Sequence, residues 1–223
     1  MKRGNRPSGD LIPWTISEQY QDESFASLSG VRVVRIATHP SAQGRGYGSK
    51  AMELLLNYYQ NKLLDFDNIK SDEAEELKVV QPKSDKEGSL KDEKLKPKKN
   101  VKPILQRLSE RRPAPIHYIG TSFGVTKELF QFWKKNCFVP VYLRQTANEL
   151  TGEHTCVMIR PINLNDDSVQ VPDWLIQEKG LSFETVEEIQ EHSWIASYFH
   201  DFKRRLQSLL GFEFRAMPCS LAF

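Results

Sequence analysis

The fold is decided by the stretch Arg35-Ile-Ala-Thr-His-Pro-Ser-Ala-Gln43-Gly-Arg-Gly-Tyr-Gly48-Ser-Lys-Ala-Met-Glu-Leu-Leu55. Residues 31–37 predict a buried strand, because β-branched and small apolar residues dominate there. Pro40 ends this strand, since proline has no N–H and biases the preceding residue toward an extended backbone. Apolar residues at helical spacing then predict a helix over 49–63.

Three glycines, Gly44, Gly46 and Gly48, form the turn between the predicted strand and helix. Without a Cβ, their backbone can approach a ligand closely. The helix that follows presents unpaired N–H groups and the positive end of its dipole, which favours a phosphate or pyrophosphate. The turn therefore predicts a binding site for a ligand that carries a diphosphate. A purely structural glycine turn is the alternative.

Two other glycine-rich loops fit the sequence poorly. A Walker loop needs Gly-x4-Gly-Lys-Ser/Thr, which residues 44–50 do not provide. A dinucleotide fingerprint needs Gly-x-Gly-x-x-Gly and a later acidic residue at the end of a second strand. The spacing here is Gly-x-Gly-x-Gly, and the region after the helix is polar and poor in strand-forming residues.

The pattern Gln43-x-x-Gly46-x-Gly48 resembles the acetyl-CoA loop of the Gcn5-related N-acetyltransferases. Two further blocks follow in the order expected for that superfamily: a strand over 116–123, then a helix and strand over 127–144. The resemblance implies an α/β (α+β) fold, with a mixed sheet flanked by helices. Asn136 is expected to take the left-handed conformation at the helix exit. Trp133 stands where many members carry a tyrosine that protonates the leaving thiolate.

A narrower resemblance, to the eukaryotic RNA cytidine acetyltransferases, is carried by several blocks of sequence in the right order. These blocks are residues 9–14, 33–40, 46–49, 138–146 and 150–154, with a tail over 194–210 that is similar to the start of the family's RNA-binding region. The resemblance implies transfer of an acetyl group from acetyl-CoA to N4 of cytidine in small-subunit ribosomal RNA (rRNA) and transfer RNA (tRNA). A nuclear and nucleolar location, an RNA-presenting adaptor protein and a homo-oligomer are further expectations.

Members of that family are longer, and their helicase-like module carries a Walker loop, so ATP is implied for the full-length proteins only. We expect this chain to be a C-terminal fragment, a truncated gene model or a degenerate copy, which lacks the first strands and helices of the acetyltransferase fold. A catalytically incompetent interaction module and an acetyltransferase acting on protein amines are the alternative functions.

The resemblance also implies which residues contact acetyl-CoA. Backbone groups of the strand would pair with the pantetheine arm, and loop amides would hold the pyrophosphate. These cofactor-binding residues are Ile36, Ala37, Thr38, Gln43, Gly44, Arg45, Gly46, Tyr47, Gly48, Ser49 and Arg144. Arg45 could equally be a solvated loop residue, and Arg144 could instead form an ion pair on an edge strand. A Cβ at Gly48 is expected to point at the ligand.

The general base is unknown, and the chain offers His39, Glu153 and His154 as candidates, each with a structural or merely exposed role as the alternative. Cytidine N4 is not protonated at neutral pH, so a base only has to remove a proton during or after attack. Positioning and oriented dipoles can then supply much of the rate.

Composition sets the domain organisation. We expect a partial N-acetyltransferase domain over 1–162, with a charged and partly disordered insertion over 65–115. Residues 163–190 would be a linker and 191–223 the truncated start of a helical RNA-binding region.

The net charge of +2 argues against RNA binding by the whole surface. Three cysteines without metal-like spacing predict no metal site and a reducing intracellular compartment. Neither a signal peptide nor a membrane-spanning apolar run is present in the sequence, so no membrane partner is expected.

Overall fold

The computed structural model describes residues 10–64, 105, 107–162, 189 and 193–217. Most of the predicted insertion over 65–115 and of the predicted linker over 163–190 lies outside these residues. The chain forms two compact units, one from Met1–Gln60 with Ala114–Phe223 and one from Asn61–Pro113. In the second unit the structure describes a short 3-10 helix, η4 (Leu108–Glu110).

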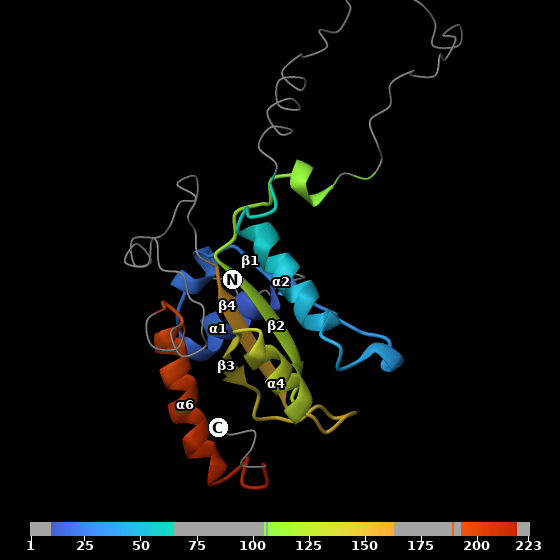
Figure 1. Cartoon of the computed structure of the whole chain (residues 1–223). Helices are drawn as coiled ribbons and strands as arrows, with labels where there is room; N and C mark the ends of the chain where they lie inside the picture. Colours follow the sequence, from blue (N-terminus) through green and yellow to red (C-terminus); the bar gives the residue numbers. More distant parts are fainter. Residues whose placement is uncertain (1–9, 65–104, 106, 163–188, 190–192, 218–223) are drawn as a thin grey trace, which may run out of the picture. The chain divides into compact units, whose positions relative to one another are not determined.

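The first unit is built on a mixed four-stranded sheet in the order β1-β2-β4-β3 (Figure 1). The strands are β1 (Gly30–Val33), β2 (Tyr118–Gly124), β3 (Val139–Leu143) and β4 (Thr155–Pro161). β1 and β2 are parallel, while β4 runs antiparallel to both β2 and β3. The carboxyl ends of β1, β2 and β3 therefore lie at one end of the sheet, together with the start of β4.

Helices cover both faces of this sheet, as Figure 1 shows. They are α1 (Leu11–Tyr20), α2 (Tyr47–Tyr59), α4 (Lys127–Lys135) and α6 (Ala196–Leu210), with 3-10 turns η1 (Ser24–Ser27) and η2 (Pro40–Ala42). One apolar core joins α1, η1 and α6 to the sheet, and a second joins α2 and α4 to it. Successive residues of β4 alternate between the two cores, because neighbouring side chains of a strand point to opposite faces. This arrangement confirms the predicted fold class.

Two predicted elements have different ends in the structure. The strand expected over 31–37 ends as β1 at Val33, where its pairing with β2 ends although β2 continues to Gly124. The helix expected over 49–63 begins at Tyr47 and ends at Tyr59. It begins earlier because Gly46 takes a left-handed conformation at the N-cap, so the next residue can already be helical.

The exit of α4 differs from the expectation in one residue. Asn136 was expected to be left-handed, but its φ is −92°, and Cys137 takes the left-handed angle with a φ of 61°. The peptide N–H of Cys137 donates to the Lys134 carbonyl at 3.0 Å, which closes the last turn before β3 begins. The left-handed position therefore lies one residue later than predicted.

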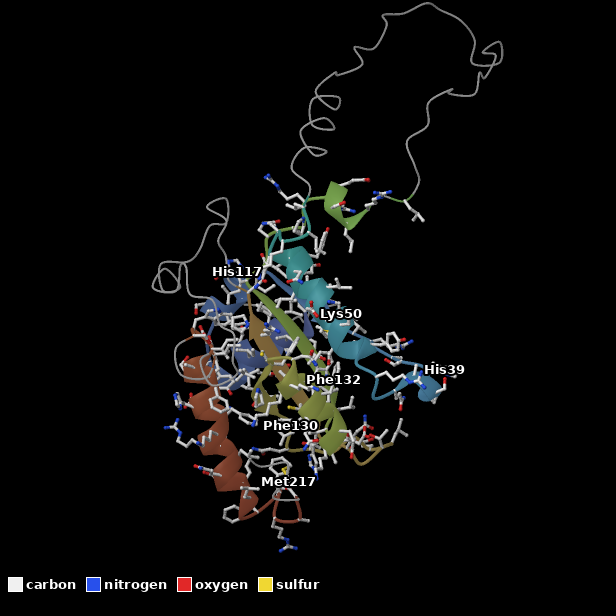
Figure 2. The ribbon with its side chains drawn as sticks, viewed as in Figure 1. His39, Lys50, His117, Phe130, Phe132 and Met217 are labelled. Carbon is white, nitrogen blue, oxygen red and sulfur yellow. The ribbon has the colours of Figure 1, made fainter. Side chains whose placement is uncertain are left out.

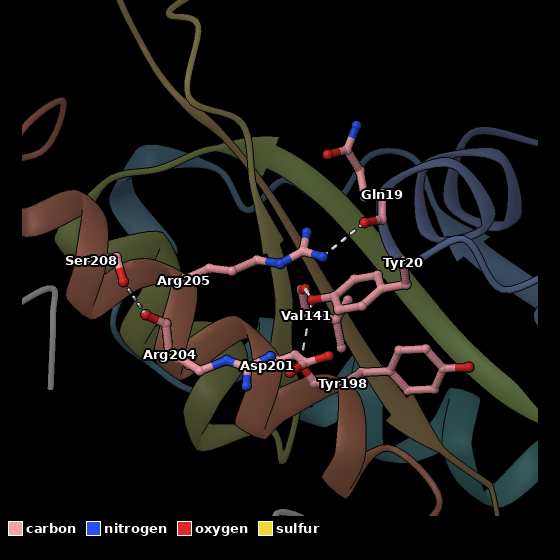
Figure 3. A network of polar contacts seen from close by, with 8 residues as sticks. All are labelled: Gln19, Tyr20, Val141, Tyr198, Asp201, Arg204, Arg205 and Ser208. Carbon is pink, nitrogen blue, oxygen red and sulfur yellow. Dashed lines mark hydrogen bonds and ion pairs between the residues drawn. The ribbon is translucent and has the colours of Figure 1, made fainter.

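A network of polar contacts fixes α6 to the sheet and to α1 (Figure 3). The hydroxyl of Tyr20 donates to the carbonyl of Val141 in β3, and the hydroxyl of Tyr198 in α6 donates to the carboxylate of Asp22. The guanidinium of Arg205 stacks 4.5 Å above the Tyr20 ring and donates to a backbone carbonyl of α1 at 2.8 Å. The α6 helix thus belongs to the same compact unit as the sheet, and an RNA-binding role for 191–223 stays a prediction.

Tyr20→Phe should lower the free energy of unfolding by about 1–2 kcal/mol, because it leaves a part-buried carbonyl without its donor. That carbonyl belongs to Val141, where the ladder between β3 and β4 changes register. Burial raises the pKa of Tyr20 to about 12, so the hydroxyl stays a donor at any ordinary pH. Urea unfolding measures the effect, and Tyr47→Phe, at a residue 62% exposed, is the control. Equal stabilities of the two variants would contradict the role of this bond.

Candidate functional site

The parallel strands β1 and β2 separate after four paired positions. Their register ends at Val33 and Thr121, yet β2 continues to Gly124 in its pairing with β4. The chain from Val34 onward leaves the ladder, and Val34 is 70% exposed. The backbone groups of 36–38, which were predicted to pair with pantetheine, are therefore not used by a neighbouring strand of the described sheet.

The segment between β1 and α2 is held by its own side chains. Gln43 donates from its amide nitrogen to the Thr38 carbonyl at 3.3 Å. His39 caps the η2 turn, because its Nδ1 accepts the backbone N–H of Ser41 at 3.3 Å. This imidazole is exposed and committed to a local turn, which favours the structural alternative for His39 over a catalytic one.

The loop leads into α2, whose N-terminus has no side-chain cap. Gly44 and Gly46 have φ angles of 74° and 86°, which a residue with a Cβ rarely adopts. The N–H of Lys50 donates to the Gly46 carbonyl at 2.9 Å and begins the helical pattern. The N–H groups of 47–49 precede that bond, so they point out of the helix end together with its positive dipole. This geometry suits a pyrophosphate.

Gly48 has a packing reason for being glycine. A Cβ at this position would lie 3.1 Å from Cε2 of Phe132, which is tighter than ordinary contact. Figure 2 shows Phe132 on α4 and Lys50 on the neighbouring first turns of α2. The sequence predicted a Cβ directed at the ligand, whereas the structure directs it at α4.

Gly46→Ala should weaken acetyl-CoA binding by about fivefold to thirtyfold, because a left-handed alanine costs about 1–2 kcal/mol. A Cβ at Gly46 meets nothing within 4 Å, so the effect isolates backbone strain from steric conflict. Isothermal titration measures the affinity. Gly46→Asn is the matched control, since asparagine tolerates the left-handed region. The same loss in both variants would show that strain at this position is not the cause.

The catalytic candidates Glu153 and His154 lie where β4 begins, at the end of the sheet where β1 leaves β2. The Glu153 carboxylate lies directly in the space that a Cβ of Gly124 would fill. His154 Nδ1 lies 3.0 Å from the Arg144 carbonyl. Because a carbonyl only accepts, Nδ1 carries a proton, and in the neutral imidazole Nε2 keeps the lone pair. Both side chains can therefore accept a proton at this end of the sheet.

Arg144 follows β3, and the strands β2 and β4 lie between β3 and β1. The distance between β1 and β3 is therefore about 14 Å at ordinary strand spacing. Its side chain is exposed and forms no ion pair within the described residues. A contact of Arg144 with CoA stays a prediction, as does one of the exposed Arg45.

Two other side chains near the site belong to the core. Trp133 is 3% exposed and packs against three phenylalanine rings, so its side chain is part of the core. Burial raises the pKa of the Cys156 thiol to about 12, so this thiol is neither a nucleophile nor an acid at neutral pH. The described residues contain no cluster of three or more metal-ligating side chains. None of their helices is long and apolar enough to cross a membrane.

The comparisons with known proteins agree with this geometry. A family described as GNAT acetyltransferase 2 matches residues 1–163. The chain belongs to this GNAT family. An acetyltransferase domain of this kind implies the use of acetyl-CoA.

Curated relatives of this GNAT chain are RNA cytidine acetyltransferases. The protein from Dictyostelium discoideum is 45% identical over 232 residues, which cover 100% of this chain and 20% of that protein. The protein from Saccharomyces cerevisiae is 44% identical over 216 residues, covering 96% of this chain and 18% of that protein. The human protein is 41% identical over 222 residues, covering 100% of this chain and 19% of that protein. The chain therefore spans about a fifth of the length of these relatives.

The structure adds residues to the GNAT site that the sequence did not single out. Phe132 supports the first turn of α2, and Gly124 makes room for the Glu153 carboxylate. No local pattern signals either role, because each depends on a contact between elements that are distant in sequence.

Proposed function

We propose that this chain is the acetyl-CoA-binding part of an RNA cytidine acetyltransferase, which transfers the acetyl group to N4 of cytidine. The separation of β1 from β2, beside the uncapped N-terminus of α2, carries this proposal. It leaves backbone donors and acceptors that pair with no neighbouring strand of the described sheet, next to a helix end suited to phosphate. Acetyl-CoA is a linear thioester with a diphosphate at its far end. Its groups therefore complement these two parts of the site in the same order.

In this proposal the N–H groups of 47–49 bind the pyrophosphate, and the backbone of 36–38 aligns the pantetheine arm. Acetyl-CoA supplies an activated thioester carbonyl. The alignment directs the thioester toward the carboxyl end of β2, near Glu153. There the cytidine N4 attacks the carbonyl carbon, and Glu153 or His154 Nε2 accepts the N4 proton as the thiolate leaves. The thiolate takes up a proton to give CoA.

Glu153 is the stronger candidate for the base by position, because it lies over Gly124 at the end of β2. His154 is held toward β3 by its bond to the Arg144 carbonyl, and its ring lies in a T-shaped contact with Phe214, with 4.8 Å between the ring centroids. Since proton removal is a small part of this barrier, positioning of the two reactants contributes more to the rate.

We further propose rRNA and tRNA as substrates of the longer protein, with a nuclear and nucleolar location and an RNA-presenting adaptor. The names of the relatives support RNA as the substrate class. A role of 191–223 in RNA binding, ATP use by other segments of the longer protein, and a homo-oligomer belong to the same proposal.

Isothermal titration of acetyl-CoA into the full chain tests the binding step, and a dissociation constant in the micromolar range is expected. No heat at millimolar ligand would defeat the assignment of the loop. Mass spectrometry of nucleosides from RNA treated with the longer protein tests the reaction. N4-acetylcytidine supports the proposal, whereas acetyl-lysine in a supplied peptide without acetylcytidine would favour a protein-amine acetyltransferase.

A further inference from the structure

The end of α4 is joined to the first turn of α2 by the side chain of Asn136, which is 8% exposed. Its Nδ2 lies 2.7 Å from the Phe132 carbonyl and 3.4 Å from the Ser49 hydroxyl oxygen. A carbonyl only accepts, so the atom next to Phe132 must be the amide nitrogen, and the orientation of the amide is fixed. Both hydrogens of Nδ2 are then donated, one to each oxygen.

The sheet holds Asn136 in place from the other side. Arg160 of β4 donates from a guanidinium nitrogen to the backbone carbonyl of Asn136 at 2.8 Å, and β4 is paired on both sides in the sheet. A continuous set of contacts therefore runs from Arg160 through Asn136 to Ser49. These contacts reach α2 at Ser49, next to the position where Phe132 packs against Gly48.

Ser49 occupies the third position of α2, the last of the three residues whose N–H groups precede the helical pattern. Its hydroxyl oxygen accepts the bond from Asn136, which leaves the hydroxyl hydrogen for a donation of its own. Ser49 is half-buried, and its hydroxyl belongs to the same first turn of α2 as the N–H groups of 47–49.

We propose that Asn136 is a positioning residue for acetyl-CoA, which orients the Ser49 hydroxyl to donate to the pyrophosphate. This inference rests on the proposed function of the loop. Asn136 does not touch the ligand but acts through Ser49, so loss of either side chain removes the same hydrogen bond. A bond to a charged phosphate oxygen is among the stronger hydrogen bonds in proteins.

The test measures affinities of the full chain for acetyl-CoA and for acetyl-pantetheine, which keeps the thioester arm but lacks the pyrophosphate and nucleotide. Asn136→Leu and Ser49→Ala should each weaken acetyl-CoA binding about tenfold and leave acetyl-pantetheine binding unchanged. In a Ser49→Ala background, Asn136→Leu should have no further effect. Ser49→Thr, which keeps a hydroxyl, should retain the wild-type affinity.

Three results would overturn the inference. One is an equal loss for both ligands with Asn136→Leu, which indicates a general disturbance of the fold. Another is a double variant whose loss of acetyl-CoA affinity equals the product of the two single losses. The third is unchanged acetyl-CoA affinity of Ser49→Ala, which decides the matter even when Asn136→Leu does not fold. Binding by the wild type keeps the proposed function intact in all three cases, whereas failure of the wild type to bind acetyl-CoA overturns both.

Discussion

Gly48→Glu is expected to weaken acetyl-CoA binding to the full chain by at least about 100-fold in isothermal titration. The Cβ of the new side chain points at α4, but its carboxylate adds a negative charge to the first turn of α2, close to where the pyrophosphate is expected. Two like charges about 5 Å apart repel by about 3 kcal/mol at the effective dielectric constant of a protein surface. The longer side chain also has to displace the Phe132 ring, which lies 3.1 Å from the Cβ position.

Gly48→Gln separates charge from size in this experiment. It has the shape of the glutamate variant without the charge, so its loss of affinity should stay within about tenfold. Thermal melts should place both variants at similar stability, since an acidic side chain is favourable in the first turn of a helix. Unchanged affinity of Gly48→Glu would show that the loop does not hold the pyrophosphate.

Phe25→Ala should produce the largest loss of stability, about 3–5 kcal/mol. Phe25 is fully buried and lies between α6 and the sheet, with ring centroids 5.3 Å from Tyr118, 6.0 Å from Trp194 and 5.7 Å from Tyr198. Removing it leaves a cavity and ends three aromatic contacts at once. A fall of about 10 °C in melting temperature is expected for a domain of this size.

Phe212→Ala is the control for that measurement, since Phe212 is 77% exposed. Its effect should stay within about 0.5 kcal/mol, as for most surface substitutions. Equal melting temperatures for the two variants would show that α6 is not anchored to the sheet through Phe25.

The strand–turn–helix unit could be predicted because its signals are local. Three glycines, a proline and a run of apolar residues determine their own conformation, so α2 was placed within a few residues of its true ends. The end of β1 could not be predicted, because Val34 and its successors are as apolar as those before them. The strand ends where β1 separates from β2, and this separation is a property of the whole sheet.

The same distinction applies to the site. The glycines of the loop could be predicted because their spacing is a local pattern within one short segment. The support from Phe132 and Asn136 was not, because it depends on how α4 packs against α2. The left-handed residue was placed at Asn136 from its chemical tolerance, but the length of α4 puts that conformation at Cys137.

The short pairing of β1 with β2 has a consequence for the lifetime of the protein. In the proposed complex, a pantetheine arm between the separated strands would take the place of a strand, so the bound ligand would add to the stability of the sheet. By thermodynamic linkage, acetyl-CoA at 100 times its dissociation constant adds about 2.7 kcal/mol to the free energy of unfolding. Resistance to proteolysis is therefore expected to rise with the concentration of acetyl-CoA.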